Sequence, residues 1–182
     1  MKFKRCMVIL MIAVVLVGGA VFFLFHEDCD RLPDADAVRD AEKLVKVHIH
    51  PGHKYSFDVM EVGVYQHLDR CYTYDVIPEE MLGGLLFQGI HRPPAGTAVE
   101  FEMFAPARVY FFFHYTVDGG YTQIMQSLPE WKLIEKAPQY DIHNGEHGLR
   151  MTMYTLDAEP GVYRIPPTTR PRACYNIVFV PR

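Results

Sequence analysis

Residues 97–116 read TAVEFEMFAPARVYFFFHYT, and this stretch decides the fold class. In 97–104, Val99, Phe101 and Met103 share one face of an extended chain, and the intervening glutamates share the other. The second half is a further apolar and aromatic run of strand length. Together the two halves predict two neighbouring β-strands.

Similar runs recur throughout the body of the chain, separated by turn residues such as Pro-Gly and Asn-Gly. One short helix is predicted over 121–128, and no βαβ alternation is present. The pattern therefore predicts an all-β, antiparallel sandwich or jelly-roll-like domain over 43–182. The remaining predicted strands are 43–49, 59–65, 71–77, 84–90, 131–136, 149–156, 161–165 and 174–180.

The composition excludes several classes of protein. The chain has 182 residues, of which 49% are hydrophobic and 13% aromatic, so intrinsic disorder is excluded. The formal net charge is −4. Residues 1–25 hold three basic residues and no acid, which leaves residues 26–182 at a net −7. We therefore expect no nucleic-acid partner.

The apolar segment 7–25, MVILMIAVVLVGGAVFFLF, has the length and composition of a transmembrane helix. A basic cluster of Lys2, Lys4 and Arg5 precedes it, so the positive-inside rule predicts a cytosolic N-terminus. The C-terminal domain is then extracellular or lumenal. The alternative is a cleaved signal peptide. The acidic stretch 26–42 is expected to be a stalk or a short helix.

Four cysteines are interpreted by compartment. Cys71 and Cys174 lie in predicted strands of the body and are disulfide candidates in an oxidising compartment. Cys29, in the predicted stalk, is an interchain candidate that would give a homodimer. The alternative is that all three are unpaired. Cys6 borders the apolar segment and is a palmitoylation candidate.

The stretch 62–90, VGVYQHLDRCYTYDVIPEEMLGGLLFQGI, resembles a β-sandwich accessory module found beside carbohydrate-active enzymes and on cell-surface proteins. The resemblance covers about residues 62–166. It implies a β-sandwich with a role in sugar binding or adhesion. This chain has His114 where the module has an aspartate after its aromatic strand, so no ligand role of that acid carries over. The matching positions are Val62-Gly63, Tyr65, Asp69-Arg70, Tyr72, Tyr74, Val76, Pro78-Glu79-Glu80, Gly83 or Gly84, Phe101, Val109-Tyr110, Phe113, Pro129, Trp131, Leu133, Tyr154 and Pro160 to Ile165.

The region 115–140 is the predicted ligand-facing surface. Sugars stack their apolar faces on flat aromatic side chains while polar neighbours bind the hydroxyl groups. The alternatives are a core role for the tryptophan and a loop-bracing ion pair for the aspartate and arginine. The candidate ligand-binding residues are Tyr115, Tyr121, Trp131, Tyr140, Asp69 and Arg70.

Two histidine-containing clusters are weak metal candidates. One combines His48, His50 and His53, and the favoured interpretation is a solvated strand end. The other spans 141–147, with Asp141, His143, Glu146 and His147, and is better explained as an exposed hairpin loop. We therefore predict no metal and no cofactor.

No catalytic motif is present in the sequence, and no paired carboxylates are positioned for hydrolysis. The sequence predicts a non-enzymatic, single-pass type II membrane protein whose β-sandwich binds a glycan or glycoprotein. The alternative is a structural or assembly subunit that docks to a larger membrane complex. In that case Phe111, Phe112 and Phe113 would expose an aromatic patch.

Overall fold

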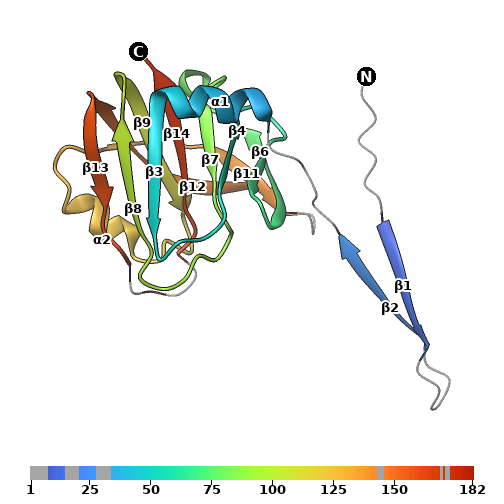
Figure 1. Ribbon diagram of the computed structural model, residues 1–182. Helices are drawn as coiled ribbons and strands as arrows, with labels where there is room; N and C mark the ends of the chain where they lie inside the picture. Colours follow the sequence, from blue (N-terminus) through green and yellow to red (C-terminus); the bar gives the residue numbers. More distant parts are fainter. Residues whose placement is uncertain (1–7, 15–20, 28–33, 143–145, 169, 171–172) are drawn as a thin grey trace. The chain divides into compact units, whose positions relative to one another are not determined.

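A computed structural model describes residues 8–14, 21–27, 34–142, 146–168, 170 and 173–182 (Figure 1). Its contacts divide the chain into two units, Met1–Arg31 and Leu32–Arg182. Each unit is described separately.

The N-terminal unit contains two antiparallel strands, β1 (Val8–Val14) and β2 (Val21–Glu27). Their register pairs Val8 with Glu27 and Val14 with Val21. Over these two ranges the structure has strands where the sequence predicted a transmembrane helix over 7–25. Valine, isoleucine and phenylalanine suit extended strands, and a uniformly apolar run has no periodicity that separates strand from helix. Within the described ranges, no helix has the length and apolar character needed to cross a membrane.

The larger unit begins with one helix and continues almost entirely in strands. Its elements are α1 (Ala35–Leu44), β3 (Val45–His50), β4 (Ser56–Val59), β5 (Tyr65–His67), β6 (Arg70–Val76), η1 (Glu79–Met81), β7 (Leu85–Gln88), β8 (Ala98–Met103), β9 (Ala107–His114), α2 (Tyr121–Gln126), β10 (Lys132–Ile134), β11 (Gln139–Ile142), β12 (Glu146–Ala158), β13 (Gly161–Ile165) and β14 (Asn176–Pro181).

Helix α1 belongs to the folded unit. Asp34 caps it, because the Asp34 carboxylate accepts hydrogen bonds from the backbone N–H groups of Asp36 and Ala37. Its apolar face is buried in the core through Ala37, Ala41 and Leu44. The stretch 26–42 was predicted to be a stalk or a short helix, and from residue 35 onward it forms a helix that is part of the domain.

Two antiparallel sheets form the sandwich. The smaller has the strand order β13-β8-β3, and it lies in front of the central strands in Figure 1. The larger has the order β4-β7-β14-β9-β12-β11-β6-β5, with β10 also paired to β12. The predicted all-β, antiparallel sandwich is confirmed at this level.

Local patterns located most of these strands. Strand β8 buries Val99, Phe101 and Met103 as its alternation predicts. Helix α2 falls within the predicted helix at 121–128. The predicted strand 59–65 is wrong, because β4 ends at Val59 and a turn with Gly63 at φ 84° separates it from β5. Glycine tolerates this left-handed backbone, so the chain turns there.

The first core fills the space between the two sheets. It also receives the apolar faces of α1 and α2. Its large aromatic side chains come from six strands, from α2 and from the residues just before β10 and β14. They are Phe57, Phe87, Phe101, Phe111, Phe113, Tyr121, Trp131, Tyr154, Tyr175 and Phe179.

The second core lies on the opposite face of the larger sheet. Although β6 is three strands away from β9 in the sheet, the rings of Tyr74 and Phe112 are only 5.9 Å apart. The sheet therefore folds back over its own face. The residues of the second core are Met60, Val64, Tyr74, Met81, Leu86, Tyr110, Phe112, Tyr140, Met151, Met153 and Val178.

Strand β9 is consequently buried on both faces. Phe111 and Phe113 point into the first core and Phe112 into the second, and all three are fully buried. The exposed aromatic patch predicted for Phe111–Phe113 is therefore wrong. Alternation places the side chains of β9 on two faces of the sheet, and one of these faces was predicted to be exposed to solvent. The folded-back part of the sheet covers that face.

Candidate metal centre

The second core ends in a group of buried polar side chains. Strand β9 ends at His114, which lies on the same face as Tyr110 and Phe112. In β14, Asn176 pairs with Phe112. If this register is continued by two residues, Cys174 lies opposite His114 and on the same face.

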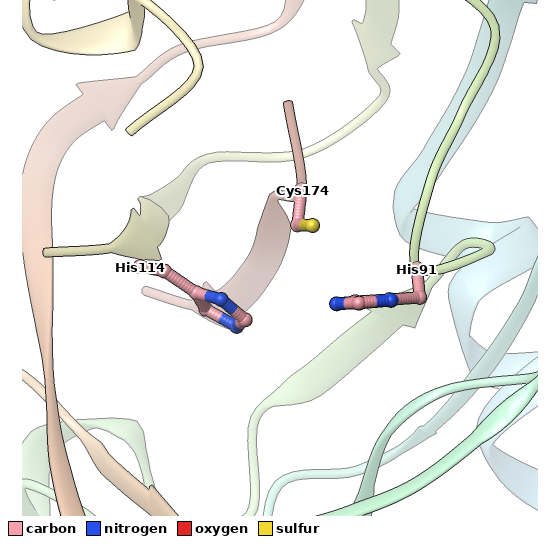
Figure 2. A group of neighbouring side chains, drawn as sticks. All are labelled: His91, His114 and Cys174. Atoms are coloured by element: carbon pink, nitrogen blue, oxygen red, sulfur yellow. The ribbon is translucent and has the colours of Figure 1, made fainter. Parts of the chain in front are cut away.

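The third member of this group, His91, comes from the other side of β14. Strand β7 pairs with β14, and the loop that follows β7 carries His91 back to the sheet end. Figure 2 shows the imidazoles of His91 and His114 and the sulfur of Cys174 directed toward a common centre. Three segments far apart in sequence meet there because β7, β14 and β9 are neighbours.

These three side chains form a candidate metal site. One ligand atom from each lies within 4.8 Å of the others. His91 and His114 are each 7% exposed and Cys174 is 2% exposed. A tetrahedral zinc ion holds nitrogen and sulfur ligands about 3.3–3.7 Å apart, so a contraction of about 1 Å would close the set. We refer to His91, His114 and Cys174 as the metal centre.

The surroundings keep the metal centre uncharged without an ion. Burial lowers the pKa of His91 and of His114 to about 4. Burial also raises the pKa of the Cys174 thiol to about 11. Both imidazoles are therefore neutral at pH 7 and ready to donate a lone pair, whereas the thiol must lose a proton to bind an ion.

Neighbouring polar groups orient the imidazoles. A ring nitrogen of His114, Nε2, lies 3.2 Å from Oε1 of Gln66. As donor to that oxygen, Nε2 carries the proton and leaves Nδ1 for an ion. The His91 backbone N–H donates to Oδ1 of Asp69 at 2.7 Å. Nδ1 of His91 is buried and has no hydrogen-bond partner among the described residues.

Aromatic rings form the walls around the histidines. The His114 ring stacks on Tyr140 with centroids 4.4 Å apart. The His91 ring meets Tyr72 edge to face at 5.1 Å. These contacts hold the planes of the two imidazole rings.

The predicted bridge between Cys71 and Cys174 is wrong. Cys71 is disulfide-bonded, whereas Cys174 carries a thiol. Cys174 lies near the imidazoles of His91 and His114 at the end of the second core, and no pattern in the sequence predicts these neighbours. Cys29 and Cys6 lie outside the described residues, so the interchain bridge and the palmitoylation remain predictions.

The aromatic ligand platform predicted in 115–140 does not form. Tyr121, Trp131 and Tyr140 are all buried, because α2 and the strands beside it pack these rings into the two cores. Tyr115 is 61% exposed, and the guanidinium of Arg150 lies 5.5 Å from its ring centroid. Only one of the four aromatic candidates therefore presents its ring to solvent.

Asp69 and Arg70 brace a loop, as the alternative interpretation proposed. Their charged groups are 3.8 Å apart and partly exposed. The Asp69 carboxylate accepts the backbone hydrogen bond of His91, which ties the loop after β7 to the start of β6. Asp69 therefore helps to position the metal centre.

The two histidine clusters noted in the sequence do not assemble into metal sites in the part of the chain that the structure describes. His48 and His50 are exposed on the outer face of β3. Asp141 and His147 form an exposed pair at 2.7 Å, which lowers the pKa of Asp141 and raises that of His147. His143 lies outside the described residues.

The sequence did not indicate the metal centre. In the sequence, His114 is a departure from the module, Cys174 is a disulfide candidate, and His91 belongs to no predicted site. The available signal was the position of His114 and Cys174 at the ends of two apolar runs. That signal becomes informative only when the two strands are known to be adjacent.

No protein-family model matches the chain, and no curated protein matches it. Among solved structures, the chain is similar to a β-glucuronidase from glycoside hydrolase family 2, with a TM-score of 0.57 and 13% sequence identity. The match covers 87% of this chain and 16% of that enzyme chain. At this identity the likeness concerns the fold alone, and it supports the β-sandwich that the module resemblance implied.

We expect the metal-free protein to lose stability as the pH falls from about 6.5 to about 4. The pKa values of His91 and His114 are about 4 in the folded chain, against about 6.5 when unfolded. The unfolded chain therefore binds more protons between these values, and the free energy of unfolding decreases as the pH falls. Urea unfolding in the presence of EDTA at several pH values measures this slope.

The variant His114→Gln should flatten that slope, and His48→Gln, which changes an exposed histidine, should leave it unchanged. Equal slopes in all three proteins would contradict the expectation.

Proposed function

We propose that residues 34–182 form a β-sandwich that binds one transition-metal ion, with Zn²⁺ as the expected ion, at His91, His114 and Cys174. The observation that carries the proposal is the convergence of three buried ligand atoms within 4.8 Å of one another. Thiolate and imidazole ligands suit zinc and copper, and they are unsuited to calcium or magnesium.

The buried Nδ1 of His91 adds support. A buried polar atom without a partner costs free energy, and coordination of an ion removes that cost. The proposed role is to bind the metal ion, without catalysis.

We expect the metal-free full chain in detergent to bind one Zn²⁺ in competition with a chromophoric chelator. Cys174→Ser and His114→Gln should each weaken binding by about 100-fold or more, because even second-sphere changes at metal sites cost about 10–100-fold. His48→Gln is the matched control and should bind as the wild type does.

The wild type provides a second measurement that needs no variant. Co²⁺ bound at the metal centre should give a thiolate-to-cobalt charge-transfer band, which reports Cys174 directly. Absence of a 1:1 complex, or binding that Cys174→Ser leaves unchanged, would contradict the proposal.

A second candidate function is glycan or glycoprotein binding, and a separate cleft favours it. The cleft has a volume of about 460 Å³ and lies between the end of β6, η1 and the β10–β11 connection. Arg150 lines it, and Arg150 also lies over the exposed ring of Tyr115. Glu79, Glu135 and Lys136 add hydrogen-bonding groups to the lining.

An exposed aromatic ring beside a polar cleft suits a sugar, since the ring takes the apolar face and the charged groups take the hydroxyls. The similarity in fold to a β-glucuronidase is compatible with glycan binding but is not evidence for it.

The apolar segment 7–25 would hold the domain at a membrane with the N-terminus in the cytosol, and Cys29 would join two chains. Retention of the chain in membranes washed with alkaline carbonate measures the first of these.

We expect saturable binding of the detergent-solubilised full chain on a glycan array. Tyr115→Ala and Arg150→Ala should abolish that binding in folded protein, whereas Leu133→Ala, a change at an exposed position on β10, should not. If the folded wild type binds no glycan, glycan binding is excluded as a candidate function. The remaining alternative is then a structural or assembly subunit that docks to a larger membrane complex.

A further inference from the structure

His67 lies beside the metal centre and has no explained role there. It is the last residue of β5 and is 2% exposed. Its ring centroid is 5.2 Å from that of His91 and 6.4 Å from that of His114. Neither of its ring nitrogens has a hydrogen-bond partner among the described residues.

A buried imidazole with two unpartnered nitrogens is costly. A buried polar group without a partner destabilises a protein by roughly 1–3 kcal/mol. A core packing role would be met at lower cost by an apolar side chain of similar volume. A histidine at position 67 is therefore better explained as a group that donates a nitrogen lone pair to a bound ion.

The backbone of β5 places this side chain beside the metal centre, next to the rings of His91 and His114. The pairing between β5 and β6 shifts its register between Tyr65 and His67, which is the mark of a β-bulge or a similar irregularity. Regular alternation would send Gln66 and His67 to opposite faces, yet both side chains lie beside His114. Irregularities of this kind redirect side chains and are common beside functional sites.

Gln66 already serves the metal centre. Its side chain contacts His114, and its backbone carbonyl accepts a hydrogen bond from the Asn176 amide at 2.6 Å. The bulged segment therefore brings one orienting residue and one unpartnered imidazole to the same place. No other described histidine is buried with both nitrogens unpartnered.

We infer that His67 is the fourth protein ligand of the metal centre, which completes a closed set of three imidazoles and one thiolate. The inference rests on the proposed metal-binding function. Four protein ligands fill a tetrahedral ion and leave no position for water or substrate. The domain would then hold the ion for structure or storage, and not for hydrolysis.

The test uses Co²⁺ bound to the full chain, with free imidazole as the probe for an open position. The wild-type spectrum should be that of four-coordinate Co²⁺ and should not change when imidazole is added. In His67→Ala, affinity for Co²⁺ should fall by about 10–100-fold. Added imidazole should then bind the vacated position, change the spectrum and restore much of the lost affinity.

Three outcomes are distinguishable. A wild type that binds Co²⁺ and responds to imidazole, as His67→Ala does, has an open three-ligand site and overturns the inference. His67→Ala with unchanged affinity and spectrum also overturns it. A wild type that binds no Co²⁺ refutes the proposed function itself.

X-ray absorption of the wild-type Zn²⁺ complex covers the case in which His67→Ala fails to fold. Imidazole rings give a characteristic multiple-scattering signal. We expect three imidazoles and one sulfur, at about 2.0–2.1 Å and 2.3 Å. Two imidazoles and one sulfur would overturn the inference without any variant.

Discussion

The burial of β9 on both faces is the constraint on which the rest of the structure depends. A strand with apolar side chains on both faces needs cover on two sides. The β13-β8-β3 sheet covers one face, and the β11-β6 edge of the larger sheet folds back over the other.

The metal centre is a consequence of where the second core ends. Apolar packing along β9 stops at His114, the last residue of the strand. The polar groups gathered there are as buried as the core beside them, so burial suppresses every charge that they could carry. A buried group of neutral lone-pair donors is suited to an incoming cation.

Fold and function separate clearly in this protein. The similarity to a family 2 glycoside hydrolase domain concerns a sandwich shared by many unrelated activities. The three side chains of the metal centre and the Arg150 cleft lie in different places, and each would serve a different ligand. The function therefore has to be argued from these sites and not from the architecture.

The sequence by itself determined the local elements. The alternation in 97–104 located β8 and its buried face, and the residues before Pro129 located α2. Tertiary structure decided what those elements touch. Phe112, Tyr121 and Trp131 are buried because distant strands cover them, and His91, His114 and Cys174 meet because β7, β14 and β9 are neighbours. Side-chain periodicity is local, whereas strand order and register depend on the burial of the whole chain, so no local pattern could reveal the metal centre.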